Sequence, residues 1–136
     1  MKGPDPEIQQ KVAQWLAYAD EDLRMAKHSL GMPDAEPPYR LIAYHAQQCV
    51  EKHLKAFLVR HCKDFPYTHN ISTLLEVCGD LGDWPETMEE AEELTPYAVT
   101  ARYPGENDEV TQKEALQAIE IAQRVRLQVR TQLGQK

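Results

Sequence analysis

Residues 39–62 read YRLIAYHAQQCVEKHLKAFLVRHC, and this stretch decides the fold class. Apolar side chains recur in it at steps of three and four residues, which is the period of an α-helix. The residues that make up this apolar side are Ile42, Ala43, Ala46, Cys49, Val50, Leu54, Phe57 and Leu58. Because a helix that is apolar over a broad arc must be covered from several directions, we expect this one to lie at the centre of the protein.

The first and last segments of the chain also have a helical period. Asp5 and Pro6 open the first one, since an aspartate accepts hydrogen bonds from free amides and a proline fits the first turn. This helix is expected to end at Gly31. The last helix begins with Thr111 and Glu114, whose T-x-x-E spacing is a capping box. Its apolar side consists of Leu116, Ile119, Ala122, Val125, Val129 and Leu133.

Two shorter helices are expected between these elements. Residues 68–70 read THN and supply capping side chains for a helix that stops at Gly79. Another helix, from residue 86 to about 103, is expected to be interrupted near Pro96, which has no N–H to donate. No segment shows the alternation of a strand. The sequence therefore predicts an all-α fold, an antiparallel up-and-down bundle of four to five helices, as a single domain over residues 1–136.

Charge and composition exclude several classes of function. The 136 residues carry a formal charge of -7, which disfavours general binding to duplex DNA because phosphates would be repelled. No apolar run is long enough for a membrane span, and the first residues lack a secretory signal, so a cytoplasmic location is expected. The charge is uneven, however. Glu51 is the single acid among the basic residues of segment 39–63, whereas segment 76–114 is strongly acidic.

Metal and nucleotide-cleavage motifs are missing from the sequence. His45, Cys49 and His53 are spaced by four residues and would stack along one helix, but Phe57 lies on the same stripe and indicates packing. The three cysteines form no C-x-x-C pair, and the glycines form neither a P-loop nor a G-x-G-x-x-G motif. We therefore expect no metal site and no cofactor.

Three motifs, taken in order, resemble the HEPN domain family (higher eukaryotes and prokaryotes nucleotide-binding). Residues 44–58 read YHAQQCVEKHLKAFL and are similar to the family's Gln-Gln-x-x-Glu-Lys-x-x-Lys-Ala helix. Residues 68–75 (THNISTLL) and 102–104 (RYP) are similar to motifs that follow it in the family. Trp15 and residues 19–23 look like the family's first helix. The resemblance extends over nearly the whole chain.

The resemblance implies a helical bundle and a set of partners. Family members often homodimerise, and many are encoded beside a minimal nucleotidyltransferase in a toxin–antitoxin-like arrangement. We therefore expect a homodimeric HEPN-type module that partners such a nucleotidyltransferase and binds nucleotide or phosphate weakly, without catalysis. The alternative that the resemblance implies is a metal-independent endoribonuclease, a toxin that cleaves RNA with an arginine and a histidine.

The arginine–histidine pair of such a ribonuclease is not found at the usual spacing. Arg102 matches the family's arginine, yet no histidine follows it. Arg40 and His45 have a suitable spacing, but on a helix five residues turn about 140°, so their side chains would point apart. A ribonuclease would therefore need a rearranged pair, either Arg102 with His69 or Arg40 with His45.

Five polar residues form the expected ligand-binding set. Gln48, Lys52 and Lys55 share one face of the central helix, and His69 precedes a helix whose N-terminal amides favour anions. Arg102 comes from a separate element and is expected to complete a phosphate-facing cluster. Each residue also has a structural alternative, such as pairing between Glu51 and Lys55 or packing of His69 against Tyr67.

Overall fold

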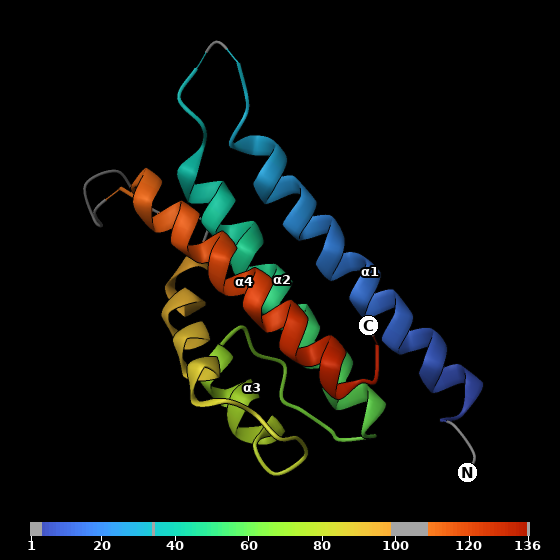
Figure 1. The fold of residues 1–136 in the computed structure, drawn as a ribbon. Helices are drawn as coiled ribbons and strands as arrows, with labels where there is room; N and C mark the ends of the chain where they lie inside the picture. Colours follow the sequence, from blue (N-terminus) through green and yellow to red (C-terminus); the bar gives the residue numbers. More distant parts are fainter. Residues whose placement is uncertain (1–3, 34, 99–108, 136) are drawn as a thin grey trace.

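A computed structural model describes residues 4–33, 35–98 and 109–135. These residues form five helices and no strand, which confirms the predicted all-α bundle (Figure 1). The helices are α1 (Pro6–Ser29), α2 (Tyr39–Arg60), α3 (Ile71–Cys78), the 3-10 helix η1 (Glu86–Ala98) and α4 (Gln112–Gln132). None of the helices in these ranges combines the length and the apolar character that crossing a bilayer requires.

Helix α2 is the central element, as its sequence predicts. It contacts each of the other four helices (Figure 1). The long helices α1 and α4 lie alongside it, and the short helices α3 and η1 also pack against it. Phe57, Ile42, Leu54 and Leu58 are completely buried. Burying an apolar side chain of this size contributes about 2 kcal/mol to the stability of the fold. The packing of the surrounding helices against α2 is therefore a major source of that stability.

The predicted starts of α1 and α4 are confirmed, and α1 ends at Ser29, two residues before Gly31. The Asp5 carboxylate accepts a hydrogen bond of 2.8 Å from the backbone N–H of Glu7. At the start of α4, the Thr111 hydroxyl accepts from the Glu114 N–H, and the Glu114 carboxylate accepts from the Thr111 N–H, each at 3.1 Å. One expectation for α4 is wrong, because Leu116 is 46% exposed rather than part of the buried side.

Removing the capping box should weaken α4 measurably. We expect Thr111→Ala to lower the free energy of unfolding by about 1 kcal/mol, because the amides of the first turn lose their acceptor. Chemical denaturation followed by far-UV circular dichroism measures this change. Thr131→Ala is the matched control, since Thr131 only donates back to the Leu127 carbonyl near the end of the same helix, and its effect should stay below about 0.5 kcal/mol.

The expected kinked α-helix after residue 86 is wrong in type, because residues 86–98 form a continuous 3-10 helix that includes Pro96. Its buried side chains explain the difference. Met88, Ala91 and Leu94 are spaced by three residues, and a helix with three residues per turn places them in one row against the core. The remainder of the expected helix, residues 99–103, lies outside the described residues.

Candidate functional site

A buried carboxylate on α2 organises the polar residues at the α2–α3 boundary. Glu51 is 3% exposed, and its Oε2 accepts a hydrogen bond of 2.9 Å from the Lys55 ammonium. Its Oε1 lies 2.7 Å from Nδ1 of His69 and accepts a bond of 3.2 Å from the Gln47 amide. Residues four apart on a helix are neighbours, so Gln47 and Lys55 reach Glu51 from the turns before and after it. We call Gln47, Glu51, Lys55 and His69 the Glu51 network.

Lys55 is buried with its charge because aromatic rings surround it. Its ammonium lies 5.6 Å from the ring centroid of Trp15, 5.9 Å from that of Phe65 and 6.0 Å from that of Tyr67. The negative faces of aromatic rings attract a cation at such distances. Three rings and one carboxylate therefore replace the water that a lysine normally keeps.

His69 is the solvent-facing member of the Glu51 network. Its side chain is 52% exposed, although Nδ1 contacts the buried carboxylate. Its backbone carbonyl accepts a bond of 3.3 Å from Gln47, which fixes the loop just before α3. When Nδ1–H donates to Glu51, the neutral ring keeps Nε2 as an unprotonated acceptor. This arrangement suits a histidine that binds an anion when protonated or accepts a proton when neutral.

The electrostatics keep Glu51 ionised. Burial raises the pKa of its carboxyl, but the hydrogen bonds from Lys55 and His69 and the charge of Lys55 outweigh burial, and the resulting pKa lies below the usual value. Glu51 therefore acts as a hydrogen-bond acceptor for Lys55 and His69 rather than as a proton donor at neutral pH.

A second network, of one carboxylate, one histidine and one lysine, lies between α1 and α2. Asp22 is buried on α1, and its Oδ1 lies 2.8 Å from Nδ1 of His45 while its Oδ2 accepts a bond of 2.5 Å from Lys52. A carboxylate, a histidine and a lysine thus come together twice. Because Lys52 and Lys55 are three residues apart on α2, the two networks flank one face of this helix.

The structure brings some of the predicted ligand-binding residues together and separates others. Lys55 and His69 meet at Glu51, and the Gln48 amide reaches this group by donating to the Gln47 side chain at 2.7 Å. Lys52 instead pairs with α1. Arg102 lies outside the described residues. The structural alternatives for Lys55 and His69 also hold, because the Glu51–Lys55 pair forms and the Tyr67 and His69 ring centroids are 5.9 Å apart.

The geometry bears on two other expectations. Two amides at the start of α3 already donate to side chains, the Thr73 N–H to Asn70 and the Ile71 N–H to Thr95. Fewer amides are therefore free to bind an anion there than the sequence predicts. Arg40 and His45 both lie in α2, where five residues turn the helix by about 140°. His45 is turned toward Asp22 on α1.

The expected ligand-binding set left out Asp22, Gln47 and Glu51, of which Glu51 was considered only as a structural partner of Lys55. Asp22 had a detectable signal, because it lies three residues after Ala19 on the otherwise apolar side of α1, where an acid needs a cationic partner. Gln47 is the first glutamine of the Gln-Gln-x-x-Glu-Lys motif, but the motif does not show its partners. Its role depends on the loop before α3, which the spacing of residues along α2 does not specify.

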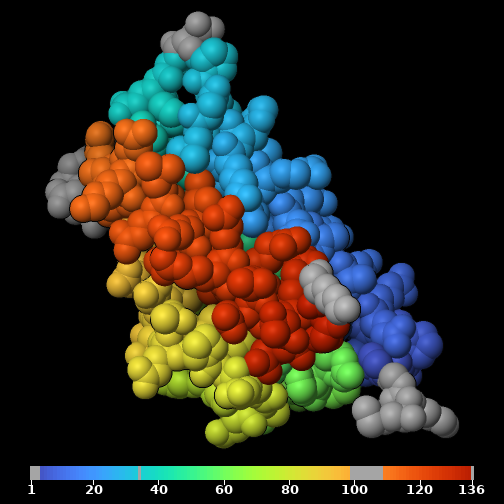
Figure 2. Space-filling view, viewed as in Figure 1, coloured from blue at the N-terminus to red at the C-terminus, as the bar shows by residue number. Residues whose placement is uncertain are grey.

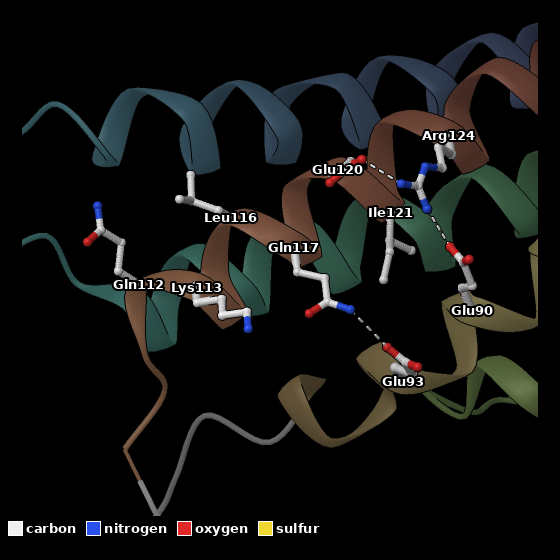
Figure 3. A pocket seen from close by; sticks show the side chains of 9 residues that line it. All are labelled: Glu90, Glu93, Gln112, Lys113, Leu116, Gln117, Glu120, Ile121 and Arg124. Carbon is white, nitrogen blue, oxygen red and sulfur yellow. Dashed lines mark hydrogen bonds and ion pairs between the residues drawn. The ribbon is translucent and has the colours of Figure 1, made fainter.

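A cavity of about 770 Å³ lies between η1 and α4 (Figure 3). Five of its polar side chains are paired with one another. Arg124 donates to Glu90 and Glu120, and Gln117 donates to Glu93, as the dashed lines show. Within the described ranges, no three His, Cys, Asp or Glu side chains are grouped as metal ligands. These glutamates therefore link η1 to α4 at the surface, and we assign them no ligand.

Comparison with known proteins agrees with this architecture. A sequence model of the HEPN domain matches residues 12–132. The crystal structure of TT1696 from Thermus thermophilus is similar, with a TM-score of 0.74 and 29% identity over 90% of this chain and 98% of that one. The crystal structure of ST0689, an archaeal HEPN homologue, is similar with a TM-score of 0.71 and 26% identity over 98% and 99% of the two chains. No curated protein matches the sequence.

Proposed function

Because the chain belongs to the HEPN domain family, we propose that it is a non-enzymatic HEPN-type module that binds a nucleotide weakly at the Glu51 network. The observation that carries this proposal is the single buried carboxylate that holds Lys55 and His69 together. A half-exposed histidine positioned in this way presents a cationic donor to a phosphate group once it is protonated.

The surroundings of His69 suit a ligand that has both a phosphate and a ring. Tyr67, two residues before His69, is 93% exposed, which is unusual for a large aromatic side chain. A nucleobase stacks on such a ring without needing a specific hydrogen-bond pattern. A nucleotide thus supplies an anion for His69 and a flat ring for Tyr67.

Titration with ATP tests the proposed ligand. Amide NMR of the wild-type protein should show shifts around residues 47–55 and 67–70, and His69→Ala should weaken binding by about tenfold, the effect of losing one charge-assisted hydrogen bond. His28→Ala is the matched control, because His28 is exposed on α1 and is not part of the network. If ATP leaves both segments unshifted, the nucleotide proposal is wrong.

We further propose that the module works as a homodimer beside a minimal nucleotidyltransferase, in a toxin–antitoxin-like pair. Support for this comes from the family membership and from the exposed apolar side chains, which include Leu116 and Leu127 on α4. Light scattering at micromolar concentration tests the dimer, and a monomer alone would contradict it. Co-purification with the nucleotidyltransferase encoded by an adjacent reading frame tests the partner, and separate elution would contradict it.

A second candidate function is a metal-independent endoribonuclease. The Glu51–His69 contact of 2.7 Å favours it, because a carboxylate that orients a histidine ring is the arrangement of a general base. In this case His69 would take the proton from a ribose hydroxyl, with Arg102 as the phosphate-binding partner. Incubation of RNA with the wild type, His69→Ala and His45→Ala tests whether the protein cleaves RNA. If the wild type and His45→Ala cleave RNA and His69→Ala does not, the ribonuclease function is supported and the non-enzymatic proposal is wrong.

A further inference from the structure

A groove between α1 and α4 shares no residue with the Glu51 network. Its volume is about 490 Å³, within the range of small-molecule sites. Figure 2 shows the boundary between α1 (blue) and α4 (orange to red) on the face turned to the reader. The residues that line the groove are Asp20, Leu23, Arg24, Lys27, Gln123 and Arg126. We call it the α1–α4 groove.

The single acid of the groove is already neutralised. Asp20 accepts a bond of 2.9 Å from Nε of Arg126 and one of 2.8 Å from Nη2 of Arg130. Burial raises the pKa of the Asp20 carboxyl, but the Arg126 bond and the two guanidinium charges outweigh burial, so the pKa is below its usual value. One carboxylate thus holds two arginines and positions the Arg126 guanidinium in the wall of the groove.

The other two cations of the groove have no partner within the described residues. Asp20 would be the natural i,i+4 partner of Arg24 on α1, but it is engaged with α4 instead. The residues four and three positions before Lys27 are Leu23 and Arg24, so neither of them is an acid that could pair with it. Neither Arg24 nor Lys27 forms a hydrogen bond or ion pair with another described side chain. The groove is therefore positive on a protein whose formal charge is -7.

We propose that the α1–α4 groove is a binding site for a phosphate-bearing anion with at least two phosphate groups. Two guanidinium groups and one ammonium, contributed by two helices, offer the forked and point-like donors that phosphate oxygens accept. The Gln123 side chain adds a neutral donor, and Leu23 gives the groove an apolar contact. The phosphates belong either to a free polyphosphate, such as that of a nucleotide, or to an RNA backbone. This inference does not depend on the proposed function of the Glu51 network.

Binding of inorganic tripolyphosphate, ATP and a short single-stranded RNA to the full-length protein tests the site. We expect amide NMR shifts in segments 23–27 and 123–126, and at least a tenfold loss of affinity in Arg24→Gln/Lys27→Gln. Both substituted residues are exposed, so the variant should remain folded. The control Lys11→Gln/Arg60→Gln removes the same charge from exposed positions elsewhere and should bind as the wild type does.

The outcomes separate the sources of phosphate and the two sites. Binding of tripolyphosphate identifies a polyphosphate ligand, whereas binding of RNA alone identifies a nucleic-acid backbone, provided that each depends on Arg24 and Lys27. His69→Ala should leave the shifts in the groove unchanged, so failure of the Glu51 network and failure of the groove are distinguishable. The proposal is overturned if no phosphate probe shifts the groove, or if both double variants lose affinity equally.

Discussion

Replacing Glu51 with alanine is expected to lower the free energy of unfolding by about 3 kcal/mol. The Lys55 side chain is only 7% exposed, so without Glu51 its charge would remain buried without an acceptor. His69 and Gln47 would lose a partner at the same time. Urea denaturation followed by circular dichroism gives the change directly.

Two further variants separate the buried charge from simple loss of packing. Glu51→Met/Lys55→Met removes both charges and keeps most of the volume, so it should be at least about 2 kcal/mol more stable than Glu51→Ala. Glu7→Ala breaks the exposed Glu7–Lys11 pair on α1 and should cost less than about 1 kcal/mol. Equal destabilisation by Glu51→Ala and by the double variant would show that the buried charge is not the cause.

The protein should lose about 3 kcal/mol of stability through His53 as the pH falls from 6.5 to about 4. His53 is completely buried, and Nδ1–H donates to the Cys49 carbonyl at 2.9 Å. Burial, with the charges of Arg130 and Arg126 nearby, lowers the pKa of this histidine from 6.5 to about 4. Between these two pH values His53 is protonated in the unfolded chain but remains neutral in the folded protein. Its contribution to the free energy of unfolding is therefore complete above pH 6.5 and is lost as the pH falls to about 4.

Comparison with His53→Asn isolates this contribution from that of the carboxylates. An asparagine amide can still donate to the Cys49 carbonyl but does not titrate. The variant should therefore show a shallower decline in unfolding free energy between pH 6.5 and about 4. His28→Asn, at an exposed position on α1, should decline as the wild type does. Parallel curves for His53→Asn and the wild type would contradict the assignment.

The helices were predictable because their signals are local. The Thr111 capping box and the Asn70 cap each depend on residues within one helical turn, and the breadth of the apolar arc around Phe57 is enough to place α2 at the centre. The type of η1 was also encoded, since Met88, Ala91 and Leu94 repeat every three residues rather than at mixed steps of three and four. The rule that a proline interrupts an α-helix concealed this pattern.

The candidate site was less predictable because most of its pairings are between distant segments. The spacing along α2 correctly placed Lys52 and Lys55 on one face and offered Glu51 as a partner of Lys55. It could not show that Asp22 on α1 holds Lys52 or that His69 reaches Glu51. The cationic groove was missed for the same reason. Arg24 and Asp20 look like an ordinary helical ion pair until α4 brings Arg126 and Arg130 to the aspartate.

The 3-10 geometry of η1 constrains how this segment can change in length during evolution. Each residue of such a helix turns the chain by about 120°, so the loss of one residue before Leu94 would turn that side chain out of the buried row. Deleting or inserting three residues would restore the orientation and move the following chain by about 6 Å. Related sequences should therefore differ in this segment by multiples of three residues, which an alignment of close homologues can reveal.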